Sequence, residues 1–140
     1  MTLPSLYLKS QMDRRIARGH LWIYSNEVDV KRSPLKGLEP GTQVQVYSAK
    51  ERLLGVAQVN PANLICARMV SRTAEPLRGG LLRERLSQAL QLREAAFDQP
   101  YYRLVYGDSD LLPGLVVDRF GNYLVVQIAS AGMEQLKDEL

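Results

Sequence analysis

The residues best suited to chemistry are cationic and aromatic side chains near the N-terminus. Six of them could contact RNA: Lys9, Arg14, Arg15, Arg18, His20 and Tyr24. Cations bind phosphates, and aromatic rings or guanidinium planes can stack on unpaired bases. The alternative is a solvent-exposed charged helix, with Trp22 and Tyr24 in the core, where large aromatic side chains are usually found. The core is the favoured place for both rings, and a structural role is favoured for the isolated histidine.

Two further features could indicate catalysis or metal binding. Gly107–Asp110 places two carboxylates two residues apart. No further carboxylate or histidine follows at ligand spacing, so a turn is favoured over a metal or acid–base site. Cys66 lies in a candidate strand without a cationic cluster to activate it, which predicts a packed thiol. The sequence therefore assigns no catalytic, cofactor-binding or metal-ligating residue.

The cationic cluster should be positioned by a short helix between two strands. Leu6–Ser10 and residues 21–28 are the candidate strands, and Ser10–His20 is the candidate helix. Ser10 is a plausible N-cap, and Gly19 stands where a C-cap would be. Arg14 and Arg18 are four residues apart and should share one helix face.

Further strands are expected to complete a small curled sheet. Thr42–Ala49 alternates, with Val44 and Val46 on one face and glutamines on the other. The candidate strands 53–60 and 64–71 follow in close succession. Three strands joined by turns favour a small barrel or a strongly curled sheet.

The second half of the chain changes pattern after a join at residues 72–80, which contain proline and glycines. Leu81–Phe97 is the clearest helix, with an apolar stripe formed by Leu82, Leu86, Ala89, Leu90 and Phe97. Tyr102–Tyr106 is a candidate strand, and a hairpin is expected around Gly121-Asn122. Asp118 and Arg119 are expected to form surface ion pairs. Met133, Leu136 and Leu140 have helical spacing.

Composition excludes several classes of protein. With 46% hydrophobic and 24% charged residues, the chain has the balance of a folded domain and not of a disordered one. One cysteine excludes an internal disulfide framework and a zinc site with several thiolates. The cationic surplus lies in residues 1–72, and residues 73–140 have an acidic surplus. The basic half is the natural place to look for a polyanionic partner, although modest surpluses are common on protein surfaces.

The last four residues, Lys137–Leu140, read KDEL, which is an endoplasmic-reticulum retention signal in secreted-pathway proteins. Such a signal requires entry into that pathway, and the first residues lack a signal-peptide pattern. No stretch approaches the roughly 18 apolar residues of a membrane span. A helix interrupted by the end of the chain is therefore favoured over a retention signal.

Two distinctive stretches, Leu8–Val28 and Tyr102–Gln127, resemble the front part of a bacterial methyltransferase family. That family uses S-adenosylmethionine to methylate carbon 5 of a cytosine in large-subunit ribosomal RNA. Asn60–Arg68 resembles the closing strands of its PUA domain, a small RNA-binding fold. Leu21 and Leu111 depart from the family pattern, which usually has Pro and Gly there.

The resemblance implies an α+β fold with a PUA-like small mixed β-barrel at residues 1–72. A small α+β domain at 73–140 would follow, ending before a Rossmann-like methyltransferase domain that this chain lacks. The arginines would then contact ribosomal RNA, and the missing domain would hold S-adenosylmethionine, so the chain alone should be inactive. No glycine-rich cofactor loop is present to contradict this expectation.

The resemblance further implies a cytoplasmic protein that binds large-subunit ribosomal RNA and no membrane, and it leaves a homodimer open. Two alternatives stay open beside it. The first is a free-standing PUA-type RNA-binding module without catalysis. The second is a protein-interaction module that binds no RNA, in which the cationic surplus is incidental.

Overall fold

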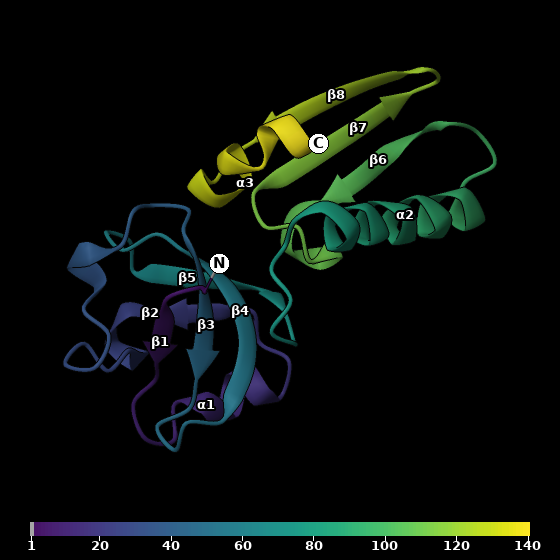
Figure 1. Cartoon of the computed structure of the whole chain (residues 1–140). Helices are drawn as coiled ribbons and strands as arrows, with labels where there is room; N and C mark the ends of the chain where they lie inside the picture. Colours follow the sequence, from purple (N-terminus) through teal and green to yellow (C-terminus); the bar gives the residue numbers. More distant parts are fainter. Residues whose placement is uncertain (1) are drawn as a thin grey trace. The chain divides into compact units, whose positions relative to one another are not determined.

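The computed structural model describes residues 2–140 and divides into two compact units, one ending at Leu77 and the other beginning at Arg78. Each unit has its own β-sheet, and helices accompany both (Figure 1). The predicted α+β fold is therefore confirmed.

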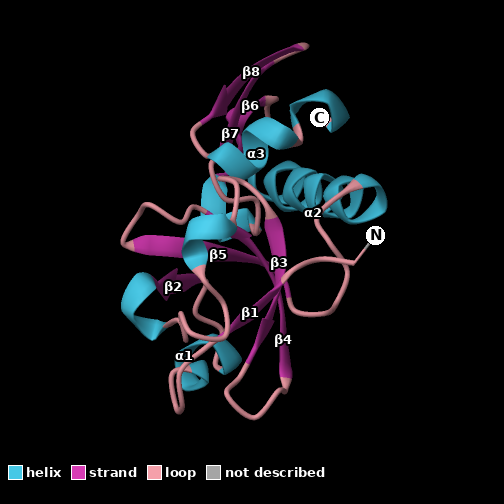
Figure 2. Cartoon of the chain, turned by 60° about the vertical axis from the view of Figure 1, so that its left-hand side comes forward, coloured by secondary structure: helices cyan, strands magenta, loops and turns pink. Residues whose placement is uncertain are grey.

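The first unit is built on a curled five-stranded sheet in the order β1-β3-β4-β5-β2. β1 pairs with β3 in parallel, and the other neighbours are antiparallel. β5 and β2 run across the direction of β3 and β4, as both views show (Figures 1 and 2). The strands are β1 Ser5–Tyr7, β2 Trp22–Tyr24, β3 Gln43–Tyr47, β4 Leu53–Val59 and β5 Ile65–Ser71.

The concave side of this sheet encloses the core of the first unit. Val44 and Val46 are fully buried, as the alternation in β3 predicted. Gln43 was expected on a polar face but is also buried. Its side-chain amide donates to the Leu77 carbonyl at 3.0 Å and accepts from the Leu77 N–H at 2.8 Å. This pairing satisfies a polar side chain that would otherwise be costly to bury.

The helix between β1 and β2 is shorter than predicted. α1 spans Asp13–Ala17 and places Ile16 in the core. Ser10 is not its N-cap, because the cap position falls on Met12 and no side chain caps the helix. Gly19 follows the C-cap with a φ of +116°, which glycine tolerates well.

The strand predicted at 21–28 ends early, because the 3₁₀ helix η1 Ser25–Glu27 follows β2. A second 3₁₀ helix, η2 Leu35–Gly37, lies in the loop before β3.

The second unit consists of a three-stranded antiparallel sheet in the order β6-β7-β8, with the long helix α2 packed on β6 (Figure 1). The predicted hairpin is confirmed, since Phe120 pairs with Tyr123 across Gly121-Asn122. The elements are α2 Gly79–Ala96, β6 Tyr101–Tyr106, η3 Gly107–Asp110, β7 Leu115–Phe120, β8 Tyr123–Ile128, α3 Ala131–Gln135 and η4 Lys137–Glu139.

Most of the predicted apolar stripe of α2 faces the sheet. Leu82 and Ala89 are buried, and Leu86 and Leu90 are half-buried. Phe97 is an exception, since it lies just past the helix with 51% of its surface exposed. Its ring stacks on Tyr102 with centroids 5.6 Å apart. The stripe therefore ends at Leu90, about two helical turns earlier than predicted.

The end of the chain is helical, as the spacing of its apolar residues predicted. The Ser130 hydroxyl accepts from the Met133 N–H and caps α3, and Met133 and Leu136 are buried. Leu140 remains 42% exposed.

The predicted turn at Gly107–Asp110 is present as η3, and it ends at Leu111 in a left-handed conformation with φ of 59°. This conformation is costly for a residue with a Cβ.

Replacing Leu111 with glycine is expected to raise the free energy of unfolding by up to about 1 kcal/mol, because glycine relieves the strain. Thermal unfolding of the two chains would measure this, and a lower midpoint for the variant would show that leucine packing outweighs the strain.

Candidate nucleic-acid interface

Four of the six predicted RNA-binding side chains lie on the surface around α1. Arg14 and Arg18 are exposed on the helix and its C-cap, and Lys9 and His20 are exposed on the segments before and after it. α1 contacts β4 of the curled sheet, and the buried Ile16 anchors it there. A short anchored helix thus presents several cations on one side of the first unit.

Arg15 has a structural role that the sequence did not indicate. Its guanidinium donates to the Glu27 carboxylate, which is nearly buried, and lies 5.3 Å from the centre of the Tyr24 ring. The same carboxylate accepts from the Tyr24 N–H at 2.9 Å. Glu27 therefore ties α1 to the end of β2, and Arg15 is its counter-ion. Tyr24 is half-buried beneath this pair.

Arg14 borders a shallow polar hollow of about 280 Å³ between the α1 segment and the β3–β4 turn. Lys50 lies on the other side of this hollow, so two exposed cations flank it. The remaining lining residues are small or polar: Ser10, Gln11, Asp13, Ser48 and Ala49. The sequence analysis missed Lys50, because the β3–β4 pairing that brings it near Arg14 is a long-range contact.

Trp22 was expected in the core, and this prediction is wrong. The indole is 39% exposed, and the Arg68 guanidinium lies 5.1 Å from its centre. The two residues are direct partners in the β2–β5 pairing. Ile23, the next residue, takes the buried position instead. The result is an aromatic ring and a cation side by side on the surface, which is a composition that can stack on a base.

A second stack of rings was also missed. Tyr7 and Tyr47 stack with centroids 5.3 Å apart, and the Arg32 guanidinium lies 3.7 Å from the Tyr7 ring. Arg32 is held in place by the Ala49 carbonyl and the Glu51 carboxylate. These contacts come from β1, β3 and the loop after β2, which the sequence separates widely.

The chain is similar to known proteins in both of its units. Residues 6–72 match the PUA-like domain family. The first unit contains a PUA-like domain. The resemblance predicted from the sequence is confirmed. An alignment that covers 98% of this chain shows 34% identity to the ribosomal RNA large subunit methyltransferase I of Vibrio cholerae. The enzyme of the same name from Erwinia tasmaniensis is 37% identical over 92% of the chain.

The PUA-like domain and the second unit together span about a third of the length of these curated relatives. Solved structures give the same picture of the fold. A SAM-dependent methyltransferase from Streptococcus mutans superposes with a TM-score of 0.79 at 20% identity, over 98% of this chain and 36% of that one. A methyltransferase solved in complex with SAH gives a TM-score of 0.78 over 99% of this chain and 35% of that one.

The part of the chain that the structure describes offers no candidate metal centre. Among residues 2–140, no group of three or more His, Cys, Asp or Glu side chains is arranged to hold a metal. No helix of residues 2–140 is both long and apolar enough to cross a membrane. The exposed cations around α1 are the candidate binding surface of the PUA-like domain.

Cys66 is buried in the core of the PUA-like domain, as predicted for a packed thiol. Burial, reinforced by the charge of Glu27, raises the pKa of its thiol from 9.0 to about 11. We expect thiol reagents near neutral pH to label the folded chain slowly, because about a hundredfold less thiolate is present than for a thiol at its ordinary pKa. Labelling followed by mass spectrometry, with and without denaturant, checks this. Equal rates in both conditions would contradict a packed thiol.

Proposed function

We propose that this chain is the RNA-binding N-terminal portion of a SAM-dependent ribosomal RNA (cytosine-5) methyltransferase. The observation that carries the proposal is the similarity along nearly the whole chain to ribosomal RNA large subunit methyltransferases, combined with the PUA-like match. In this proposal, residues 1–72 form the RNA-binding domain, and residues 73–140 form the small α+β domain that follows it.

The proposed RNA surface centres on α1. Arg14, Arg18, Lys9 and His20 would contact phosphates, since all four are exposed. Lys50 would join them across the hollow beside Arg14. Arg15 and Tyr24 would line the same surface while holding its shape, because their contacts with Glu27 fix the end of β2.

The proposed role is to hold large-subunit ribosomal RNA while another domain performs methyl transfer. Chemistry on a paired base requires that base to leave its stack, and extrusion costs a few kcal/mol. Backbone contacts made by the PUA-like domain would offset part of this cost. S-adenosylmethionine would be held outside this chain, so the chain alone is expected to be inactive. A ribosomal RNA substrate would also imply a cytoplasmic protein, which is part of this proposal.

Replacing Arg14 or Arg18 with alanine is expected to weaken binding to ribosomal RNA fragments. Each lost phosphate contact should flatten the dependence of log K on log salt by about 0.7–0.9, with little dependence on RNA sequence. Fluorescence anisotropy of labelled RNA at several salt concentrations measures both quantities.

A matched control is Lys36→Ala, which removes an exposed cation from η2 outside the proposed surface. It should change the affinity and the salt slope less than either arginine substitution. If all three variants behave alike, binding depends only on net charge, and the assignment to α1 is wrong. If none of them binds RNA less tightly than the original chain, these cations make no RNA contact.

A further inference from the structure

Trp22 and Arg68 form an exposed pair at the edge of the curled sheet. Trp22 lies on β2, which is the last strand in the sheet order, and Arg68 is its direct partner on β5. Side chains of directly opposed residues lie on the same face of a sheet. The indole is 39% exposed, and the Arg68 guanidinium lies 5.1 Å from its centre. An indole and a guanidinium in this arrangement begin a stack that an unpaired base can extend.

This pair lies close to the cations around α1. Arg72, which follows β5, is exposed, and its guanidinium donates to the Ile16 carbonyl of α1. The same guanidinium would lie 3.6 Å from a Cβ added at Gly19. Trp22 follows Gly19 by three residues, so the two Cα atoms are separated by at most about 11 Å. This short span lets a strand of RNA that is bound at α1 extend to the indole.

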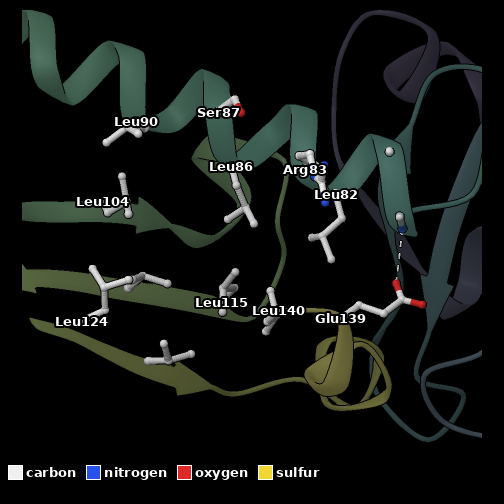
Figure 3. Close-up of a pocket in the computed structure, with 14 residues that line it drawn as sticks. Leu82, Arg83, Leu86, Ser87, Leu90, Leu104, Leu115, Leu124, Glu139 and Leu140 are labelled. Carbon is white, nitrogen blue, oxygen red and sulfur yellow. Dashed lines mark hydrogen bonds between the residues drawn. The ribbon is translucent and has the colours of Figure 1, made fainter.

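The apolar groove of the second unit is a different kind of surface (Figure 3). Leucines from α2 and from the sheet point toward one another across a space of about 670 Å³. None of the described residues that line it is aromatic, and its two charged residues, Arg83 and Glu139, have opposite signs. The groove therefore has no ring on which a base could stack and no surplus of positive charge to attract phosphates. The Trp22–Arg68 pair is better suited to a base.

We propose that the Trp22–Arg68 pair binds one unpaired nucleotide of the RNA by stacking. This inference rests on the proposed function, since it adds a base contact to an RNA surface made of cations. The indole supplies a plane on which the base stacks, and the guanidinium supplies a second plane and a positive charge. Stacking tolerates every base, because each has a flat face. The pair therefore selects an unpaired base over a paired one, and not one base over another.

Paired bases cannot reach the indole in this way. In a double-stranded RNA helix the bases stack on one another, and proteins contact mainly the backbone and the shape of the helix. A base in a loop, in a bulge or at a strand end can turn its face toward a side chain instead. The cations around α1 would hold the backbone whether or not it is paired. The Trp22–Arg68 pair would then fix the position of the domain at a junction between paired and unpaired RNA.

The fluorescence of Trp22 is the first test, because this residue is the single tryptophan of the chain. The probe is an RNA duplex with a single-stranded adenosine extension, compared with the same duplex without the extension. Binding of the extended duplex should quench the emission of Trp22, because a base then stacks on the indole. Binding of the blunt duplex should leave the emission nearly unchanged. Anisotropy of end-labelled RNA establishes that each RNA is bound, and equal quenching by both would overturn the proposal.

The second test is the effect of substitutions on affinity. Trp22→Ala should weaken binding of the extended duplex about 5- to 150-fold, which corresponds to the loss of one stacked base. It should change binding of the blunt duplex little, and it should leave the salt dependence unchanged because no phosphate contact is lost. Trp22→Phe keeps a ring and should retain most of the affinity. Tyr123→Ala, which removes an exposed ring from β8, is the matched control and should affect neither RNA.

The outcomes separate this inference from the proposed function. A chain that binds both duplexes in a salt-dependent way but tolerates Trp22→Ala would contact RNA through cations alone. That result would overturn the stacking site and leave the proposed function standing. If Trp22→Ala weakens binding of both RNAs equally, or Trp22→Phe is as damaging as Trp22→Ala, the ring supports the fold and not a base, which also overturns the inference. A chain that binds neither RNA would contradict the proposed function and the inference together.

Discussion

Replacing Asp110 with alanine is expected to lower the free energy of unfolding of the second unit by about 3–4 kcal/mol, because it breaks a buried ion pair. The Asp110 side chain is 6% exposed, and its partner Arg93 is 18% exposed. The two groups meet in two parallel hydrogen bonds of 2.7 and 2.9 Å. The substitution would leave the Arg93 guanidinium without its counter-ion in a largely dry environment.

The cost extends beyond the ion pair, since Asp110 also accepts from the Tyr106 N–H at 2.7 Å. This bond fixes the end of β6 to η3. Arg93 in turn donates to the Arg103 carbonyl on β6. Loss of the carboxylate therefore loosens α2, β6 and the loop before β7 together, and the effects should not be separable into single contacts.

Hydrogen exchange measured by mass spectrometry is the appropriate readout, because it reports on the amides of β6 and β7 separately from those of the PUA-like domain. Asp118→Ala is the matched control. It removes an aspartate from β7 of the same unit, but that carboxylate pairs with Arg103 at the surface. Surface pairs contribute little, so the control should change exchange only slightly. Equal effects of the two substitutions would show that the Asp110–Arg93 pair stabilises the second unit no more than a surface ion pair does.

The sequence predicted the turn at Gly107–Asp110 but not the ion pair within it. Turn-forming residues act locally, and their pattern can be recognised over four positions. The partner of Asp110 lies 17 residues earlier, on the opposite side of a strand and a loop. The hairpin around Gly121-Asn122 and the position of α2 were predictable for the same local reason, since turn chemistry and helical periodicity decide them.

In the candidate RNA surface, too, local features could be predicted from the sequence and long-range contacts could not. Exposed cations around α1 could be recognised from their spacing. The ion pair between Arg15 and Glu27 could not be predicted from the sequence, because it depends on how the chain turns after β2. Trp22 was misplaced because β2 has apolar residues on both of its sides, so alternation alone could not decide which of them faces the core. The pairing of β2 with β5 decides it, by placing Arg68 beside the indole.

Gly55→Ala is expected to destabilise the PUA-like domain by at least about 3 kcal/mol, because a side chain here meets both strain and a clash. Gly55 is buried within β4 at a φ of +144°. A Cβ would lie 2.0 Å from the Ser71 carbonyl oxygen of the neighbouring strand β5. Backbone atoms of paired strands cannot move apart without breaking their pairing, so the clash has no inexpensive relief.

The position of Gly55 explains why the curled sheet needs a glycine there. Register shifts occur beside it in both pairings of β4, between Val46 and Tyr47 on β3 and between Val56 and Ala57 on β4 itself. Such irregularities bend strands and increase local twist. A glycine inside an apolar strand is a recognised sign of a bulge or a close backbone approach. That sign was present in the sequence, but which strand approaches could be known only from the pairing.

Trp22 is the single tryptophan and lies in the PUA-like domain, so its fluorescence reports unfolding of that unit. Urea unfolding followed by this signal should give a much lower midpoint for Gly55→Ala than for the original chain. Gly37→Ala is the matched control: it has no atom within 4 Å of an added Cβ and no positive φ, so its midpoint should change little. A midpoint for Gly55→Ala near that of the control would mean that β4 and β5 can separate at little cost. The curvature of the sheet would then not depend on the close backbone contact at this glycine.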